Sequence, residues 1–259
     1  MAASAPADEW SNFKKTYNKV YRSYSEEQMR KAVFEETLAF VNQHNAEYEQ
    51  GKWTFDTAIN SRADWTQEEW ESILTAKAPT VRSLEAPMEF AAAPDAHDYR
   101  DYNMVTHVKD QQRCGSCWAF AVTGAVEGAW ARSTGTLLDL AEQELVDCGD
   151  GSCDGGWTSR AYQTIISMGG QMVQSDYAYT AHDDRCKYDS NAYPQATISS
   201  YRDAPSMSAS RMADTLYANH PMAVLIYASS KSFQNYHSGV YYDPNCSQST
   251  INHAVLAVG

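Results

Sequence analysis

All six cysteines of this 259-residue chain lie between Cys114 and Cys246, and the first 113 residues contain none. Cysteines clustered in this way are typical of a disulfide framework that forms in an oxidising compartment. Such a framework constrains only the segment that contains it, so the preceding residues have to gain their stability in another way. The sequence therefore predicts two differently built regions that meet near residue 113.

The charge balance limits the classes of partner. Lys and Arg total 20 against 33 Asp and Glu, which gives a net charge of −13. Phosphate binding needs a basic face, so this balance disfavours a nucleic-acid or anionic-membrane partner. The sequence also has no run of about eighteen apolar residues, the length expected of a membrane-spanning helix. We therefore expect no nucleic acid and no membrane among its partners.

The N-terminal region begins with a predicted long amphipathic helix over residues 26–48, where apolar residues recur three or four positions apart. Ser25 and Gln28 have the spacing of a capping box at its start, and Gly51 offers a stop. Residues 52–60 alternate well enough for a short strand. The apolar face of the helix is predicted from Met29, Val33, Phe40, Val41 and Tyr48.

A second helix is predicted over residues 66–74. Thr66 can cap its first turn, and Glu69 completes a capping box three residues later. The following residues, 75–94, contain three prolines and show no helical period. That composition predicts an extended connector.

The stretch "RCGSCWAF" places Cys114 and Cys117 two residues apart. This spacing occurs in redox pairs, in zinc sites, and where one disulfide cysteine lies beside one nucleophile. A thioredoxin-type pair normally follows a buried strand, whereas residues 106–113 are polar. A four-cysteine zinc site needs a second pair of the same spacing, but Cys148 and Cys153 are separated by four residues. These observations disfavour a redox pair and a zinc site, but they exclude none of the three kinds of site.

The residues that follow predict a buried central helix, because 117–130 are apolar on nearly every face. Gly124 and Gly128, one turn apart, would let another backbone approach closely. Cys117 lies in the first turn, where free N–H groups and the helix dipole favour an anion. We therefore expect the pKa of its thiol to be lowered, which would make it a reactive thiolate.

Two groups of residues resemble signatures of one family. The run "CGSCW" resembles the sequence around the nucleophile of papain and the cathepsins. The N-terminal region resembles the propeptides of cathepsin L-type cysteine peptidases. The matching positions are Glu26, Arg30, Phe34, Val41, Asn45, Asn60 and Asp64, while Thr37, Ala58 and Arg62 replace the usual Asn, Gly and Phe.

Over nearly its whole length the chain thus resembles a papain-family cysteine peptidase proenzyme of the cathepsin L branch. The resemblance implies an α+β fold, with a helical propeptide followed by a papain-like two-lobe catalytic domain. One lobe would be helical and the other an antiparallel β-barrel. The implied domains are an inhibitory propeptide at 8–78, an extended linker at 79–92 and a peptidase domain at 93–259.

In this family the chain continues past the position of Gly259. The later stretch supplies an Asn that orients the catalytic histidine, and a closing sheet. We therefore expect a sequence truncated at its C-terminus, with an incomplete β-barrel lobe. Cys246 would be unpaired in this chain, because its family partner lies in that later stretch.

The resemblance assigns roles to individual residues. Cys117 would be the nucleophile and His253 its general base, while Gln111 and the backbone N–H of Cys117 would form the oxyanion hole. Gln112 stands where the family usually has Gly. The implied disulfides are Cys114–Cys153 and Cys148–Cys186. The implied substrate-binding residues are Gly155, Gly156, Trp157, Leu225, Ile251 and Ala254.

The implied function is that of a cysteine endopeptidase zymogen, which hydrolyses peptide bonds through a thiolate–imidazolium pair and an acyl-enzyme. A hydrophobic residue would be preferred at the second position on the acyl side of the cleaved bond. The resemblance implies no cofactor, no metal, a monomer, protein and peptide substrates, and inhibition by cystatin-type or propeptide-type inhibitors.

Localisation is expected to be lysosomal or secreted, although "MAASAPADEW" lacks the basic and apolar regions of a signal peptide. A second function stays open. The chain could be a catalytically inactive truncated form whose propeptide-like domain binds and inhibits related cysteine peptidases.

Overall fold

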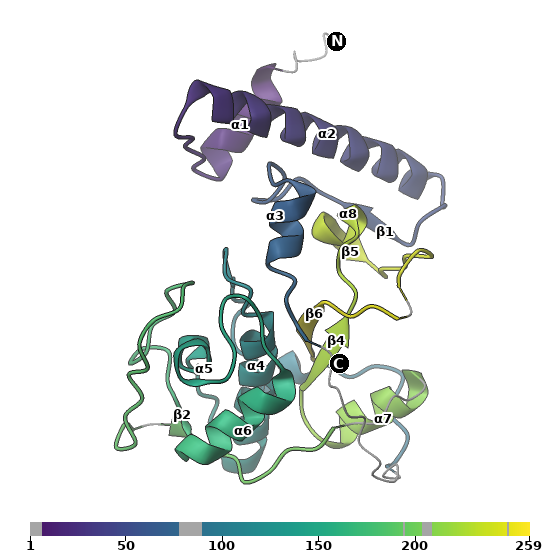
Figure 1. The fold of residues 1–259 in the computed structure, drawn as a ribbon. Coiled ribbons are helices and arrows are strands. Elements are labelled where there is room, and N and C mark those ends of the chain that lie inside the picture. Colours follow the sequence, from purple (N-terminus) through teal and green to yellow (C-terminus); the bar gives the residue numbers. More distant parts are fainter. Residues whose placement is uncertain (1–6, 78–89, 194, 204–208, 248) are drawn as a thin grey trace. The chain divides into compact units, whose positions relative to one another are not determined.

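The computed structural model describes residues 7–77, 90–193, 195–203, 209–247 and 249–259 (Figure 1). Its contacts divide the chain into two compact units. The first contains Met1–Glu71 and Ala228–Gln248, and the second contains Ser72–Tyr227 and Ser249–Gly259. The predicted linker, 79–92, lies outside the described residues except for its last three positions.

The first unit is mainly helical. It contains α1 (Ala7–Thr16), α2 (Tyr24–Glu49), nearly all of α3 (Gln67–Ser72), α8 (Lys231–Gln234) and an antiparallel pair of strands, β1 (Phe55–Thr57) and β5 (Tyr236–Gly239). Its core forms where the buried side chains of Trp10 and Phe13 on α1 pack against Phe34 on α2 and Ala63. The predicted long helix and short strand are therefore present.

The start of α2 differs from the predicted capping box. The N-cap is Ser23, whose Oγ accepts a hydrogen bond from the backbone N–H of Glu26 at 3.1 Å. Glu26 in turn accepts a hydrogen bond from the backbone N–H of Arg22 at 2.8 Å. The prediction of Ser25 and Gln28 was wrong, because Ser23 offers the same cap one residue before the helix begins.

The buried face of α2 is also different from the predicted one. Met29 is 45% exposed and Tyr48 is 40% exposed. Arg30, which was not predicted, is buried on this face. Its guanidinium donates to the carbonyl of Asp64 at 3.0 Å and pairs with the carboxylate of Glu69. A charged side chain can be buried once partners satisfy it. The buried residues of the helix are Arg30, Phe34, Thr37, Val41 and His44.

The capping box predicted for the second helix is confirmed. The backbone N–H of Glu69 donates to the hydroxyl of Thr66 at 3.3 Å, and the backbone N–H of Thr66 donates to the carboxylate of Glu69 at 3.0 Å. The same carboxylate pairs with Arg30 on α2. One acidic residue therefore caps α3 and ties it to the long helix.

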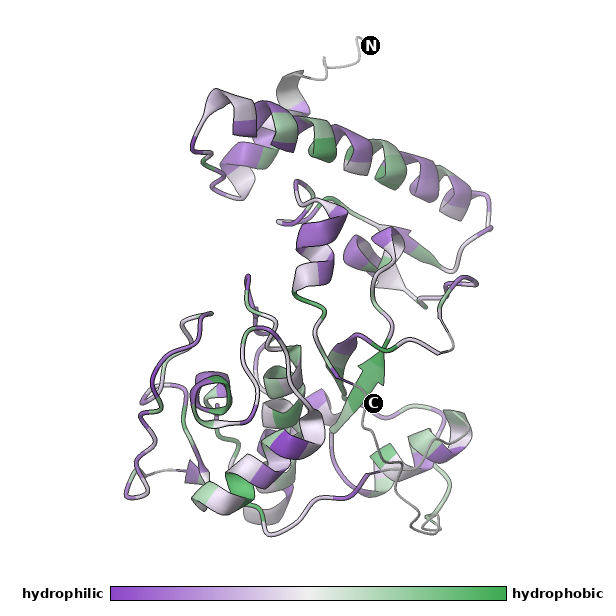
Figure 2. Cartoon of the chain, in the orientation of Figure 1, coloured by the Kyte–Doolittle hydropathy of each residue, from purple (hydrophilic) through white to green (hydrophobic). Residues whose placement is uncertain are grey.

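The second unit is built around α4 (Cys117–Thr134). It also contains a short 3₁₀ helix (Tyr99–Tyr102), α5 (Glu142–Cys148), α6 (Thr158–Met168), α7 (Ala209–Ala218), the strand pair β2 (Gln171–Met172) and β3 (Gln195–Ala196), and the strand pair β4 (Met222–Ile226) and β6 (His253–Ala257). Figure 2 shows hydrophobic residues gathered along α4 and β4. The predicted buried central helix is confirmed, because α4 is buried on most of its faces.

The two helical glycines of α4 permit close packing. A Cβ at Gly124 would lie 2.7 Å from Leu256 on β6, and a Cβ at Gly128 would lie 2.7 Å from the ring of Pro221. On the other side of α4, Trp118 and Val122 join a core with Leu140, Leu145 and Ile165. Gly124 thus lets the Leu256 side chain of β6 pack on α4, and Gly128 does the same for the ring of Pro221, which directly precedes β4. The nearest atoms belong to side chains and not to the backbone that the sequence predicted.

The strands of the second unit are antiparallel, as the α+β prediction requires. In the β4–β6 pair Leu225 lies opposite Ala254 and Ile226 lies opposite His253. Among the described residues every sheet has two strands, so no closed barrel is present. His253 is the first residue of β6. The next residue, Ala254, packs against Cys117 at the start of α4.

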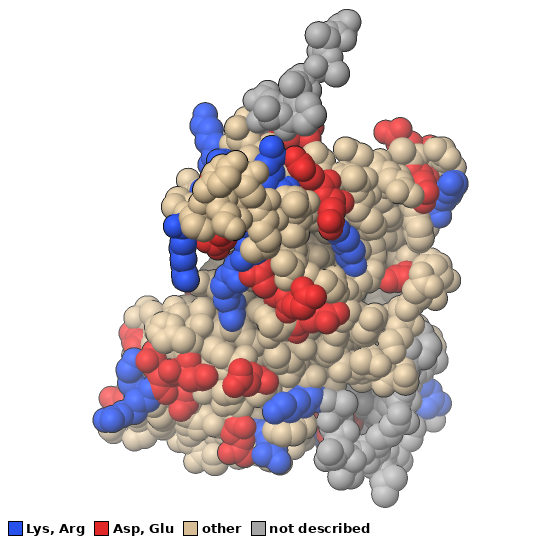
Figure 3. All heavy atoms as spheres, turned by 45° about the horizontal axis from the view of Figure 1, so that its top comes forward, with Lys and Arg blue, Asp and Glu red and all other residues tan. Residues whose placement is uncertain are grey.

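Acidic and basic side chains are interspersed on the face drawn in Figure 3. Within the described part of the chain, no helix combines the length and the apolar character needed to cross a lipid bilayer.

Candidate active site

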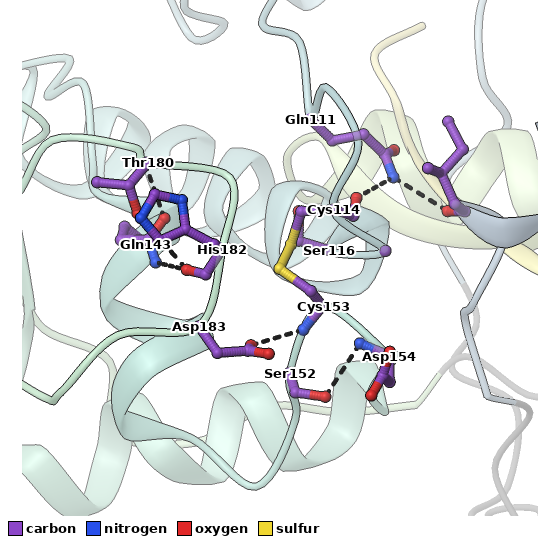
Figure 4. The surroundings of a disulfide bond; sticks show 12 residues. Gln111, Cys114, Ser116, Gln143, Ser152, Cys153, Asp154, Thr180, His182 and Asp183 are labelled. Carbon is purple, nitrogen blue, oxygen red and sulfur yellow. Dashed lines mark hydrogen bonds between the residues drawn. A yellow bond between two sulfur atoms is a disulfide. The ribbon is translucent and has the colours of Figure 1, made fainter. Parts of the chain in front are cut away.

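The six cysteines are in two chemical states, four in disulfides and two as thiols. Cys114 is bonded to Cys153, and Cys148 is bonded to Cys186, as the resemblance implied. Figure 4 shows the first bridge beside the loop that leads into α4. Because Cys114 is bonded outside the "CGSC" run, the redox pair and the zinc site are excluded as descriptions of that run.

Cys117 and Cys246 keep their thiols. The Cys246 thiol lies 3.9 Å from the carbonyl of Ser247 and belongs to the first unit. Cys117 is the first residue of α4 and is 1% exposed. The "CGSC" run therefore contains one bonded sulfur and one buried thiol.

An apolar cluster surrounds the Cys117 thiol. It consists of Ala76, Cys117, Ala121 and Ala254, with Ala223 and Leu225 packed against them. Two of the predicted substrate-binding residues, Leu225 and Ala254, thus lie against the predicted nucleophile. Ile251 is 39% exposed and is not a member of this cluster.

Burial raises the pKa of the Cys117 thiol above its ordinary value, because a thiolate without water is costly. Backbone hydrogen bonds from Ala254, Thr75, Ala76 and Trp118 act in the opposite direction but are outweighed. The direction expected from the helix terminus alone was a lowered pKa. The difference arises because the fold buries the sulfur among Ala76, Ala121 and Ala254, which the local sequence around Cys117 does not reveal.

His253 is the first residue of β6 and directly precedes Ala254. Its strand packs on α4, and Ala254 contacts Cys117. The Nδ1 atom of His253 is buried. His253, the predicted base, is distant from Cys117 in the sequence. In the structure it directly precedes Ala254, the residue that contacts Cys117.

Gln111 lies in the loop before α4, and Figure 4 shows its amide beside Cys114. Its Nε2 donates to the carbonyl of Cys114 at 2.9 Å and to the carbonyl of Ile73 at 3.0 Å. An amide that donates to a carbonyl at this place has the chemistry that an oxyanion hole needs. In the described structure backbone carbonyls of the chain itself occupy both N–H donors of the Gln111 amide.

Gln112 has a φ of 55°, in the left-handed region that favours glycine. Its backbone N–H donates to the carboxylate of Asp110 at 2.8 Å. The family's usual Gly at this place is therefore replaced by a residue whose unusual backbone is held by a local hydrogen bond.

Tyr179 was not singled out in the sequence, although its hydroxyl holds the loop before Cys117. It donates to the backbone carbonyl of Gln111 at 2.9 Å and shares a hydrogen bond with the hydroxyl of Ser116 at 2.7 Å. Its ring packs edge-on against Phe120. Burial raises the pKa of Tyr179 to about 12, so it stays a protonated donor at neutral pH. Nothing in its sequence neighbourhood distinguished it from the other tyrosines.

Residues 73–77 lie across the site as an extended peptide. Besides the bond from Gln111 to Ile73, the hydroxyl of Thr75 donates to the carbonyl of Gly115. The backbone N–H of Ala76 donates to the carbonyl of Asn252 at 3.1 Å. The backbone N–H of Lys77 donates to the carbonyl of Gly156 at 3.0 Å. We call residues 73–77 the cleft segment.

Gly155 and Gly156, both predicted to bind substrate, have different close neighbours. Gly155 has a φ of 113°, and a Cβ there would lie 2.4 Å from the carbonyl oxygen of Thr75 in the cleft segment. A Cβ at Gly156 would instead lie 2.5 Å from the ring of Trp118. Close approach of a peptide explains Gly155, whereas packing on the central helix explains Gly156. The next residue, Trp157, has the ammonium of Lys77 4.4 Å from its ring centroid.

Comparisons with known proteins agree with this architecture. Residues 93–259 match the papain family cysteine protease, and residues 10–70 match the cathepsin propeptide inhibitor domain. Digestive cysteine proteinase 1 of Homarus americanus is 39% identical over 266 aligned positions, which cover 100% of this chain and 82% of that protein. Procathepsin L of Felis catus is also 39% identical, over 96% of this chain and 76% of that protein.

Solved structures give the same result. Digestive procathepsin L 3 from Tenebrio molitor larval midgut superposes with a TM-score of 0.85 at 38% identity, over 99% of this chain and 84% of that one. A recombinant stem bromelain precursor superposes with a TM-score of 0.84 at 31% identity, over 97% of this chain and 81% of that one. With its cleft segment and its two bridged cysteine pairs, the chain belongs to the papain family of cysteine proteases and carries a cathepsin-type propeptide.

Proposed function

We propose that this papain-family proenzyme is a cysteine endopeptidase in which Cys117 is the nucleophile and His253 the proton carrier. The observation that carries the proposal is the buried Cys117 thiol at the first residue of α4, in contact with Ala254 and covered by Ala76. A peptide already lies across this thiol, which is the arrangement a peptidase needs for its substrate.

The reaction follows from these groups. The Cys117 sulfur attacks the scissile carbonyl carbon as a thiolate, and the resulting oxyanion receives hydrogen bonds from the Gln111 amide and the Cys117 N–H. His253 gives its proton to the leaving amine as the C–N bond breaks, which leaves a thioester on Cys117. Water, deprotonated by His253, then attacks the thioester and releases the acid.

The propeptide blocks this reaction through the cleft segment. Gln111 donates to the carbonyl of Ile73, so the donor proposed for the oxyanion is occupied. Ala76 packs against Cys117, and burial of the thiol raises its pKa, which favours the protonated form. We propose that residues 8–78 act as the inhibitory part, 79–92 as a linker and 93–259 as the peptidase.

Leu225 and Ala254, in the cluster that Ala76 fills, would receive the second residue on the acyl side of the cleaved bond. An apolar residue is therefore proposed at that position, while Ile251 would lie at its exposed margin. A peptide library varied only at this position tests the preference. Equal cleavage of apolar and charged residues would contradict it.

We also propose a location, an oligomeric state and a class of inhibitor. Two disulfides favour a lysosomal or secreted location, because such bonds persist in oxidising compartments. A single set of site residues on one chain favours a monomer, and a peptide-lined cleft favours inhibition by propeptide-type or cystatin-type proteins.

The test is covalent labelling with a thiol-directed epoxide, read by intact mass and peptide mapping. We expect the unprocessed chain to react slowly at Cys117, because the thiol is buried and its pKa is raised. After the propeptide is removed by limited proteolysis, one label per chain is expected on Cys117. Cys117→Ala should abolish that label.

Cys246→Ser is the matched control, because it removes the chain's other thiol. This variant should keep full labelling and full peptidase activity. A label that goes to Cys246, or no label after propeptide removal, would sink the assignment of Cys117. Absence of labelling together with tight inhibition of a related peptidase would support the inactive, inhibitory alternative.

A further inference from the structure

Lys77, the last residue of the cleft segment, places its ammonium group over the ring of Trp157. The ammonium of Lys77 lies 4.4 Å from the ring centroid of Trp157, and the Lys77 backbone N–H donates to the carbonyl of Gly156 at 3.0 Å. Trp157 is only partly buried, so its ring is accessible to a ligand. A cation over an indole face at this distance is attracted by the ring quadrupole.

The position of Lys77 in the segment is fixed by its neighbour. Ala76 lies in the apolar cluster with Cys117, Leu225 and Ala254, and it forms a bridge with Gly156. In an extended peptide, successive side chains point to opposite sides. A peptide that places one residue in the apolar cluster therefore presents the adjacent residue, farther from the thiol, to Trp157.

An exposed carboxylate, Asp154, lies three residues before Trp157 in the sequence. Trp157 holds a second cation as well, since the guanidinium of Arg160 lies 4.4 Å from its centroid and 3.5 Å from the carboxylate of Asp150. The ring is therefore a contact for both ammonium and guanidinium groups in this one structure.

We propose that Trp157 selects a Lys or Arg side chain at the third residue on the acyl side of the substrate, next to the apolar residue held by Leu225 and Ala254. The inference rests on the proposed endopeptidase function and adds a substrate class to it. Lys77 occupies this subsite in the proenzyme. Because Lys77 follows Ala76, whereas the third residue on the acyl side precedes the second, the proposal requires a substrate that runs in the opposite direction to the cleft segment.

The experiment uses the processed enzyme and fluorogenic peptides that differ only at this third residue. Arg is compared with citrulline, and Lys with homocitrulline, because each pair has nearly the same shape but differs in charge. We expect kcat/KM to be about two- to five-fold higher for the charged member, the ratio that corresponds to an exposed cation–π contact. Trp157→Leu should bring the ratio to about one, and Trp157→Phe should keep part of it.

Asp154→Asn tests whether the preference for a cation comes from surface charge and not from the Trp157 ring. If the ratio is lost in Asp154→Asn and kept in Trp157→Leu, the preference belongs to surface charge and the inference is overturned. Equal turnover of Arg and citrulline peptides by the native enzyme also overturns it while leaving the peptidase assignment intact. Failure to turn over any peptide, with no epoxide label, is instead a failure of the proposed function.

A second readout does not depend on substrate turnover. In the unprocessed chain, Lys77→Met removes the cation and keeps an unbranched side chain, whereas Lys77→Arg keeps the charge. We expect epoxide labelling of Cys117 to be about two- to five-fold faster in Lys77→Met and close to the native rate in Lys77→Arg. Equal rates in all three proteins would contradict the role of Lys77.

Discussion

At the scale of single residues, Cys114 and Cys117 lie two residues apart and have opposite chemical states. Cys114 is bonded to Cys153, whereas Cys117 is a buried thiol whose pKa is raised by that burial. A thiol is nucleophilic only as the thiolate, so the covered state is chemically protected as well as sterically blocked. The same residue is expected to gain reactivity when water and substrate replace the cleft segment.

Tyr179 provides the first prediction at this scale. Its hydroxyl holds the backbone of Gln111 and the side chain of Ser116, the residues that position the proposed oxyanion donor and the nucleophile. Tyr179→Phe is expected to lower kcat of the processed enzyme about three- to ten-fold with little change in KM. It should also lower the free energy of unfolding by about 1 kcal/mol, the usual cost of one lost hydrogen bond. Steady-state kinetics and urea unfolding measure the two effects.

Tyr177→Phe is the matched control for that variant. The Tyr177 hydroxyl donates to the carboxylate of Asp147 at 2.8 Å and accepts from the backbone N–H of Lys187 at 3.0 Å, so it has no bond to Gln111. We expect a similar loss of stability with unchanged kcat. If both variants lower kcat equally, Tyr179 acts through general stability and not through the position of Gln111.

At the scale of secondary-structure elements, the contact of α4 with the strands depends on its glycines. A Cβ at Gly128 would lie 2.7 Å from the rigid ring of Pro221 and 3.3 Å from the carbonyl oxygen of Met104. At Gly124 the nearest atoms belong to the flexible end of the Leu256 side chain, which can rotate away. The two positions look alike in the sequence and differ in what they contact.

The prediction compares these two glycines. Gly128→Ala is expected to destabilise the fold by about 1–2 kcal/mol, because overpacking outweighs the gain of about 1 kcal/mol in helix propensity. Gly124→Ala is expected to change stability by less than about 0.5 kcal/mol, since the two effects are nearly equal there. Urea unfolding of both variants measures the difference. Equal effects at the two positions would show that the strands do not press on α4 as described.

At the scale of the whole molecule, buried carboxyl groups link stability to pH. Glu144 on α5 is fully buried, and its carboxylate accepts from the backbone N–H of Met172 at 2.7 Å. Burial raises its pKa to about 7 from an ordinary 4.5, against the lowering effect of that bond. Its negative charge would also face the hydroxyls of Tyr177 and Tyr188, whose pKa values it helps to raise.

The sign of the pH effect follows from this shift. The folded state keeps Glu144 protonated between about pH 4.5 and 7, while the unfolded chain releases the proton. Its contribution to stability is therefore present below pH 4.5 and is lost as the pH rises to about 7, by up to about 3 kcal/mol. Glu144→Gln, a neutral substitute, should flatten the decline in unfolding free energy over this range.

Urea unfolding at pH 4.5 and 7.5 measures this decline, with Asp154→Asn as the control. Asp154 is exposed, so water solvates its charge in the folded and unfolded states alike, and its removal should leave the decline unchanged. An unchanged pH dependence in Glu144→Gln would show that Glu144 does not titrate in this range. A fold that is more stable in acid would suit the proposed lysosomal or secreted location.

Local sequence determined the features that depend on neighbouring residues. The capping box of Thr66 and Glu69, the apolar helix that begins at Cys117 and the need for glycine on that helix were all predictable, because helix caps and apolar patterns are properties of a few consecutive residues. The same reasoning placed the start of α2 wrongly, since Ser23 and Ser25 are both good caps and only the fold selects between them.

Tertiary structure decided everything that depends on residues brought together from afar. Arg30 is buried because Glu69 and the carbonyl of Asp64 meet it, and the Cys117 thiol has a raised pKa because the fold buries it in an apolar cluster with Ala76, Ala121 and Ala254. The residues adjacent in sequence to Arg30 and Cys117 do not determine this burial. The sequence by itself determined which groups could do chemistry, while the packing of distant segments determined which of them are covered, paired or charged.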